Sequence, residues 1–312
     1  MADQDGKKIK DPLTGVETTG HVWDDNIREF DNPLPRWWLW AFYMSVIFTL
    51  WYWVVYPAWP SGLLEKGYTL GTKTITYDSD AGETKTTHWN TRALLAHQMQ
   101  TNKSELIRQK MVKEIAETPF DTIAADPQQS KFVLAYGKSI FGDYCAACHQ
   151  RGGQGVIGHY PNLIDDAWLW GSDVSDIETS IRKGRKGNMP AHKGSLTADE
   201  IEQAAHYVLS LSKQSSDVVA IEKGKAIFNT KGCSGCHMPT AMGMKALGSA
   251  NLTDHIWTQA DVNGTDDAGK KLAAVKQVIT EGIQREMPAW ESRLKDDEIK
   301  ILVSYIKLLS QN

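Results

Sequence analysis

The most apolar stretch of the chain runs from Trp37 to Trp59 and carries no charged residue. A helix of about 23 residues rises about 35 Å, which is enough to cross the hydrocarbon core of a bilayer. The stretch begins too late and runs too long for a cleaved signal peptide, so we predict a permanent transmembrane helix and not the buried helix of a soluble domain. Aromatic residues crowd both ends, as at the two interfaces of a membrane-spanning helix: Trp37, Trp38 and Trp40, then Tyr52, Trp53, Tyr56 and Trp59.

Residues 60–129 link this helix to the rest of the chain and are mostly polar. Polarity alternates over residues 72–77 and 84–89, as it does in strands, and Asp80-Ala81-Gly82 lies between them as a turn. This pattern predicts a small exposed hairpin. Apolar positions are sparse over residues 90–117, which predict one long polar helix.

Beyond residue 130 the apolar positions recur at helical spacing. Phe132, Tyr136 and Ile140 share one helix face. No convincing strand pattern occurs in this region, which we therefore predict to be helical. Two later segments each place four apolar residues on one face: Ile201, Ala204, Ala205 and Val208, and then Ile299, Leu302, Val303 and Ile306.

The same features occur twice in the same order, which indicates an internal repeat. We predict two homologous domains, residues 130–214 and 215–312. The first copy contains Gly137-Lys138-Ser139-Ile140-Phe141, Asn162-Leu163, Trp168, Gly184, Met189-Pro190-Ala191 and Asp199-Glu200-Ile201. The second contains Gly224-Lys225-Ala226-Ile227-Phe228, Asn251-Leu252, Trp257, Gly282, Met287-Pro288-Ala289 and Asp297-Glu298-Ile299.

All four cysteines fall in two copies of Cys-x-x-Cys-His, a pentapeptide that attaches a c-type haem through two thioether bonds and brings the histidine to the iron. A zinc site would need further Cys or His ligands at short spacing, and the two motifs lie 88 residues apart. A thioredoxin-like motif would need a βαβ setting, and a disulfide framework would leave the matched histidines unexplained. We therefore predict two covalently bound haems c. The motifs are Cys145, Cys148 and His149, and Cys233, Cys236 and His237.

Met189 and Met287 are the candidates for the second axial ligand of each iron, because a thioether suits haem iron and raises its potential. Each precedes a proline, which disfavours the helical conformation and holds the methionine in an extended loop. Gap-filling methionines are the alternative, but the matched positions favour ligation. Each methionine could serve the haem of its own repeat, or the two could be crossed, with Met189 on the second haem and Met287 on the first. With both bound, neither iron has an open position for oxygen.

The net charge of the chain says little about its partners. A formal net charge of −4 and an isoelectric point near 6.1 give no indication of a nucleic-acid partner. A mildly acidic surface is compatible with docking of a basic carrier protein.

The region before the apolar stretch contains Trp23-Asp24 and the run Asn32-Pro33-Leu34-Pro35-Arg36-Trp37-Trp38. This run, followed by one anchor and two haem motifs, resembles the dihaem subunit of cbb3-type cytochrome c oxidases over nearly the whole chain. The expected fold is then mainly α: one N-terminal transmembrane helix followed by two tandem class I cytochrome c domains. The hairpin over 68–89 departs from the family in being longer, which suggests a contact with another subunit.

The resemblance implies a function and a location. Electrons would pass from a donor cytochrome c through the two haems to a monohaem c-type subunit and then to the catalytic subunit with haem b and copper, which reduces oxygen and pumps protons. The chain itself would not be an enzyme. Covalent haem attachment takes place outside the bacterial cytoplasmic membrane, so residues 1–36 would be cytoplasmic and the haem domains periplasmic. The alternatives are an independent membrane-bound dihaem carrier, for which the 32–38 run would have no purpose, and a dihaem peroxidase, which would need an open iron.

Overall fold

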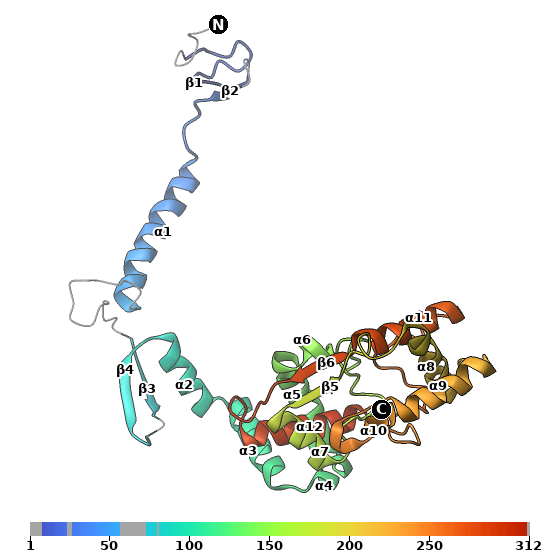
Figure 1. Ribbon diagram of the computed structural model, residues 1–312. Helices are drawn as coiled ribbons and strands as arrows, with labels where there is room; N and C mark the ends of the chain where they lie inside the picture. Colours follow the sequence, from blue (N-terminus) through green and yellow to red (C-terminus); the bar gives the residue numbers. More distant parts are fainter. Residues whose placement is uncertain (1–7, 24–26, 57–72, 80, 311–312) are drawn as a thin grey trace. The chain divides into compact units, whose positions relative to one another are not determined.

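The computed structural model describes residues 8–23, 27–56, 73–79 and 81–310 (Figure 1). The chain is mainly helical, as predicted, and divides into two compact units between Leu106 and Ile107. The first unit contains the long apolar helix, and the second contains both Cys-x-x-Cys-His motifs.

In the first unit, strands β1 (Thr18–Trp23) and β2 (Ile27–Phe30) pair antiparallel. Helix α1 (Arg36–Val55) begins after Pro35, whose carbonyl accepts from the N–H of Leu39 at 3.2 Å. Its 20 residues span about 30 Å, none of its side chains is buried, and no residue after Arg36 is charged. A helix long and apolar enough to cross a membrane is therefore present where the transmembrane helix was predicted, up to Val55, while positions 57–59 lie outside the described residues.

The predicted hairpin is formed by β3 (Thr74–Asp78) and β4 (Thr84–His88), with Ile75 opposite Thr87. Helix α2 (Thr91–Thr101) packs on β3. The side chain of Gln100 on α2 bonds both backbone groups of Asp78, accepting from its N–H at 2.9 Å and donating to its carbonyl at 2.7 Å.

The single long helix predicted for residues 90–117 is wrong, because the chain is extended at Asn102. There the Asn102 side chain accepts from the backbone N–H of Ser104 at 3.0 Å and opens a new helix, α3 (Lys103–Glu117). An asparagine that satisfies a free N–H in this way favours a helix start over a continued helix.

The second unit continues from α3 through two groups of helices. The elements of the first repeat and its approach are α4 (Phe120–Ala125), α5 (Pro127–Tyr144), α6 (Ala146–His149), α7 (Val174–Lys183), β5 (Arg185–Met189) and α8 (Ala198–Leu211). Those of the second repeat are α9 (Val218–Thr230), α10 (Cys233–His237), the 3-10 turn η1 (Lys245–Leu247), α11 (Ala268–Glu281), β6 (Ile283–Met287) and α12 (Asp296–Leu309).

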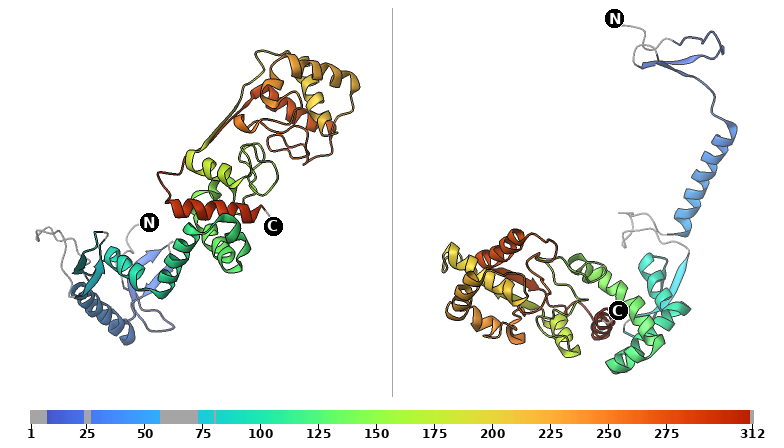
Figure 2. Two further views of the ribbon diagram at one scale, coloured as in Figure 1. Left: turned by 90° about the horizontal axis from the view of Figure 1, so that it is seen from below. Right: turned by 90° about the vertical axis from the view of Figure 1, so that its right-hand side faces the viewer.

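These helices do not pack in the order of the repeats. The last helix of the second repeat, α12, packs on α4, α5 and α7, and the last helix of the first repeat, α8, packs on α9 and α11. In the left view of Figure 2, the red helix α12 lies among the green helices of the first repeat. Each repeat therefore gives its last helix to the other, and the second unit consists of two interlocked halves.

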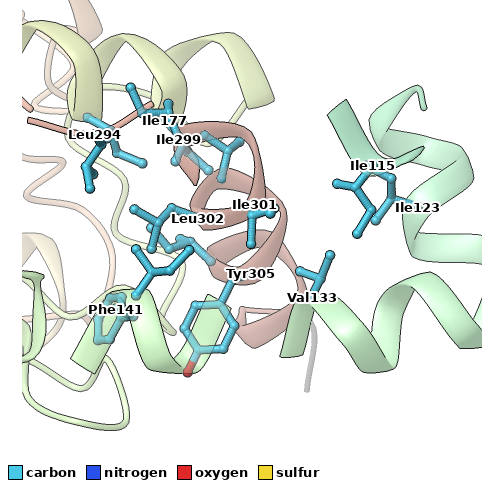
Figure 3. Close-up of a cluster of buried hydrophobic side chains, with 14 of the residues drawn as sticks. Ile115, Ile123, Val133, Phe141, Ile177, Leu294, Ile299, Ile301, Leu302 and Tyr305 are labelled. Atoms are coloured by element: carbon cyan, nitrogen blue, oxygen red, sulfur yellow. The ribbon is translucent and has the colours of Figure 1, made fainter. Parts of the chain in front are cut away.

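The two hydrophobic cores show the same exchange, because each combines helices of both repeats. One core joins Phe141 of α5 and Ile177 of α7 with Leu302 and Tyr305 of α12, and Figure 3 shows these side chains meeting around α12. The other core joins residues of α8 and α9 with Val275 and Ile279 of α11. We call these the first core and the second core.

A glycine lets the helices approach closely in each half. A Cβ on Gly137 of α5 would lie 2.7 Å from the Cβ of Tyr305 on α12. A Cβ on Gly224 of α9 would lie 2.8 Å from the Cβ of Tyr207 on α8. The matched glycines of the two repeats thus each receive the matched tyrosine of the other repeat.

The expectation of no strands in the repeats is wrong. β5 and β6 form an antiparallel ribbon in which Arg185 lies opposite Met287, Gly187 opposite Arg285 and Met189 opposite Ile283. Each strand has only five residues, and the sequence of β5 contains no β-branched or aromatic residue. The strands exist because the two repeats cross here and satisfy each other's backbone groups.

Candidate functional site

Both Cys-x-x-Cys-His motifs form a short helical turn directly after the helix that opens each half. Cys145 ends α5, with its N–H donating to the Phe141 carbonyl at 2.8 Å, and α6 follows at once. Gly232, with φ of 96°, turns the chain between α9 and α10. Because residues three apart on a helical turn face the same side, the two sulfurs of each motif can reach one planar group.

The two motif histidines are held identically. The Nδ1 atom of His149 lies 3.0 Å from the carbonyl oxygen of Pro161, and that of His237 lies 2.9 Å from the carbonyl oxygen of Ala250. A carbonyl only accepts, so Nδ1 carries the proton and Nε2 keeps its lone pair for a metal. Burial lowers the pKa of both histidines, which favours the neutral form that can bind iron.

The residue after each histidine has a strained backbone. Gln150 has φ of 64° and ψ of 161°, and Met238 has φ of 65° and ψ of 156°, a region that is nearly exclusive to glycine. Such a conformation costs on the order of 1–3 kcal/mol and persists only where the surroundings impose it. The histidine carbonyls accept here from Gly155 N–H at 2.9 Å and from Gly243 N–H at 3.0 Å, so the same loop closes behind each histidine.

None of the four cysteines forms a disulfide, so each sulfur is available for a thioether bond. Burial raises the pKa of Cys145 to about 11, with a smaller contribution from Cys148, and burial also raises the pKa of Cys233. Before a haem is attached, these two thiols are therefore neutral near pH 7.

Met189 ends β5 and Met287 ends β6. Each methionine packs against the core that holds the motif of the other repeat. Met287, from the second repeat, packs against the first core, which also contains Cys145 and Trp168. Met189, from the first repeat, packs against the second core, together with Leu252 and Trp257. Leu252 also contacts the cluster that includes Cys233. Each methionine thus lies with the motif of the other repeat.

Two glycines make this crossing possible. Gly184 has φ of 71°, and a Cβ there would lie 2.9 Å from the backbone nitrogen of Ala289. Gly282 has φ of 70°, and a Cβ there would lie 2.6 Å from the backbone nitrogen of Ala191. Sequence analysis found these glycines only as matched positions. Their role is to let the Met-Pro-Ala segment of the other repeat pass against the backbone.

The residues present fit haem c. Besides two thiols and a neutral imidazole in each half, the indole Nε1 of Trp257 is buried and has no hydrogen-bond partner within the described ranges. A buried donor without a partner is costly, and a haem carboxylate is the kind of acceptor that would satisfy it. Trp257, like Trp168, packs against a core. Asn162 and Asn251 close turns near the histidines by accepting from Ile164 N–H and Thr253 N–H, both at 3.0 Å.

Two buried polar side-chain atoms at the contact between the halves were not expected from the sequence. The Nε of Arg285 and the Oε1 of Gln259 are buried and, over residues 81–310, have no hydrogen-bond partner. Arg285 has no counterpart in β5, where Gly187 takes the equivalent place, so the repeat gave no signal for it.

Known proteins resemble the chain over almost its entire length. Residues 15–62 match the N-terminal domain of cytochrome oxidase-cbb3, FixP. Residues 133–208 and 219–306 each match the family of cytochrome c oxidase, cbb3-type, subunit III. The Cbb3-type cytochrome c oxidase subunit CcoP of Azospirillum brasilense is 37% identical over 313 residues, covering 96% of this chain and 97% of that protein. The Cbb3-type cytochrome c oxidase subunit FixP of Azorhizobium caulinodans is 38% identical over 308 residues, covering 96% and 94%.

Three observations lead to one assignment. The two halves hold their motif histidines by backbone carbonyls, the described residues include a helix long and apolar enough to cross a membrane, and the relatives match over 96% of the chain. The chain belongs to the family of the cytochrome c subunit, subunit III, of cbb3-type cytochrome c oxidases.

Proposed function

We propose that the chain is the electron-transfer subunit of a cbb3-type terminal oxidase and carries two covalently bound haems c. It takes electrons from a donor cytochrome c and passes them toward the monohaem c subunit and the catalytic subunit with haem b and copper, where oxygen reduction drives proton pumping. The observation that carries the proposal is the matched pair of helical turns, each with two thiols and a histidine whose Nδ1 is held by a carbonyl.

The residues divide the work in the same way in both halves. Cys145 and Cys148 would hold the first haem and Cys233 and Cys236 the second, while His149 and His237 would each bind the iron of one haem through Nε2. The bound haem iron would supply one-electron chemistry, and a histidine together with a methionine thioether would favour its reduced form. With both residues bound, the chain would keep water and other ligands from each iron.

The packing supports crossed methionines. Met287 lies with the core of Cys145, and Met189 lies with the core of His237's half, so we assign Met287 to the first haem and Met189 to the second. The test uses variants that attach one haem only. With Cys233→Ser and Cys236→Ser, the crossed form predicts that Met287→Ala abolishes the methionine-to-iron charge-transfer band of the remaining haem and that Met189→Ala leaves it. The in-line form predicts the reverse, and the mirror variant, with Cys145→Ser and Cys148→Ser, checks the second haem.

Helix α1 anchors the chain in the bacterial cytoplasmic membrane, since it is apolar, of spanning length and unburied. Residues 1–36 lie on the cytoplasmic side, 37–59 span the bilayer, and 60–312 lie in the periplasm, where c-type haems are attached. The linker 60–129 carries the hairpin toward another subunit of the oxidase.

The function is tested on the complex purified in mild detergent through a tag on this chain. The expected result is co-purification of b-type haem and oxygen uptake with a reduced donor cytochrome c. Only c-type haem without oxygen uptake, from a preparation shown to be intact by its subunit composition, would instead indicate an independent membrane-bound carrier.

A further inference from the structure

Two arginines lie on the inner face of the ribbon that carries the methionines. In both strands alternate residues are half-buried and the others exposed. The half-buried face carries Met189, Met287, Arg185 and Arg285, and Arg285 lies between the levels of the two methionines. Arg285 comes two residues before Met287 and lies opposite Gly187, which comes two residues before Met189. Measured along the ribbon axis, Arg285 is therefore two residues from the level of each methionine, on the same strand as Met287 and on the opposite strand from Met189.

The guanidinium of Arg285 lies where the two halves touch. It donates to the carbonyl of Gly158, in the loop between His149 and Asn162, and the N–H of Gly158 donates to the carbonyl of Thr258 at 2.9 Å. The two residues beside Thr258, Trp257 and Gln259, both carry a buried polar side-chain atom without a partner. Three such atoms, counting Arg285 Nε, thus cluster around one loop contact.

Arg285 also lacks a counter-charge, since the described part of the chain offers it no carboxylate within ion-pair distance. The other arginine of the inner face, Arg185, is satisfied: its Nε donates to Ser180 Oγ at 2.9 Å, and its guanidinium stacks on Trp170. A partly buried cation without an anion is unfavourable, because its desolvation is not compensated. Neither arginine forms an ion pair with a carboxylate in the described part of the chain, but only Arg285 has a buried nitrogen without a hydrogen-bond partner, so an acceptor is missing beside Arg285.

We propose that Arg285 is the shared charge partner of the haem propionates at the contact between the halves, and that it thereby raises the reduction potentials of both haems. This rests on the proposed function, because it requires a haem in each half. Propionates are carboxylates, and the forked guanidinium binds carboxylates bidentately. A fixed positive charge beside the propionates of a haem would favour its reduced state, which holds one more electron, and the low polarity of a partly buried site would strengthen the effect.

The ribbon offers a matched control. Lys186 lies on the outer face of β5, is exposed and pairs with Glu286 at 3.3 Å. Lys186→Gln removes one positive charge from the same ribbon, one position along from Gly187, but in a place where solvent and salt screen it. Arg285→Lys keeps the charge and loses the bidentate fork.

The experiment is a spectroelectrochemical titration of both c-type haems in the intact oxidase complex, comparing the unaltered chain with Arg285→Gln, Arg285→Lys and Lys186→Gln. We expect Arg285→Gln to lower both midpoint potentials, by on the order of a tenfold change in each reduction equilibrium, which is about 59 mV for one electron. Arg285→Lys should restore a large part of the shift, and Lys186→Gln should cause little. Haem content and methionine-ligated spectra should be unchanged.

Unchanged potentials in Arg285→Gln, a shift at one haem only, or an equal shift in Lys186→Gln would each overturn the proposal. Should Arg285→Gln fail to assemble, Arg285→Met, which keeps the apolar stem and removes the charge, makes the same comparison with Arg285→Lys. Failure of the proposed function has a different signature, because the unaltered complex would then lack one or both c-type haems.

Discussion

Replacement of Gly137 by alanine tests the exchange of helices between the repeats. The added Cβ would lie 2.7 Å from the Tyr305 Cβ and 3.0 Å from its Cγ, whereas carbon atoms in contact normally lie about 3.5–4.0 Å apart. The atom it meets is next to the backbone of α12 and cannot swing away, so α5 and α12 must separate. Overpacking of this kind costs about 1–3 kcal/mol, and the better helix propensity of alanine returns about 1 kcal/mol.

Gly142 provides the control in the same helix. It is exposed, and a Cβ there would have nothing within 4 Å, so Gly142→Ala gains the propensity term alone. The two variants should therefore differ in unfolding free energy by about 1–3 kcal/mol. For a unit of this size 1 kcal/mol shifts the Tm by about 2–4 °C, which thermal unfolding of the full chain in detergent resolves.

A double-mutant cycle identifies the partner helix. Residues in contact couple by about 0.5–3 kcal/mol, while distant pairs add within about 0.5 kcal/mol. Gly137→Ala should couple to Tyr305→Ala and be additive with Tyr207→Ala, and the first haem should lose its methionine ligand before the second on warming. Coupling to Tyr207 and not to Tyr305 would show that α5 packs on α8 of its own repeat and would refute the exchange.

Two further predictions concern the crossing glycines and a helix start. Gly184→Ala should weaken methionine ligation of the first haem and Gly282→Ala that of the second, since each substitution adds about 1–3 kcal/mol of backbone strain and a clash with the Met-Pro-Ala segment of the other repeat. Resonance Raman or near-infrared spectra of single-haem variants would record the loss. An effect of Gly184→Ala on the second haem, or of Gly282→Ala on the first, would contradict the reasoning. The Glu200 carboxylate accepts from Thr197 N–H at 2.8 Å, and this bond lowers its pKa below 4.5, so it stabilises the fold at neutral pH and the contribution disappears as the pH falls through the lowered pKa. Denaturant titrations should therefore give the unaltered chain a larger unfolding free energy than Glu200→Gln at pH 7 and nearly the same value at acid pH. An equal difference in unfolding free energy at both pH values would count against this account.

The apolar helix, the hairpin strands and the candidate haem ligands could be predicted from the sequence, because each depends on a pattern of residues that are close together in the chain. The apolar run gave α1, the alternating residues gave β3 and β4, and the two pentapeptides gave the histidines that the structure holds by carbonyl groups. The break at Asn102 was missed because a polar helix and two polar helices share one composition. Arg285 was missed because its burial and its missing counter-charge depend on residues that are distant in the sequence, and its sequence neighbours give no sign of either.

The exchange of helices could not follow from the repeat, because homologous halves offer equivalent surfaces: Gly137 can receive Tyr207 or Tyr305 with the same geometry. What separates the two arrangements is connection length. Helix α8 ends at Leu211 and α9 begins at Val218, so only a short loop joins them. Helices joined so closely pack as antiparallel neighbours, which places α8 of the first repeat against α9 of the second and leaves α5 for α12. The crossing of Met189 and Met287 then follows, since each precedes the helix that has been exchanged. The short 212–217 connection is therefore the signal in the sequence that favours the crossed methionine ligation that we propose.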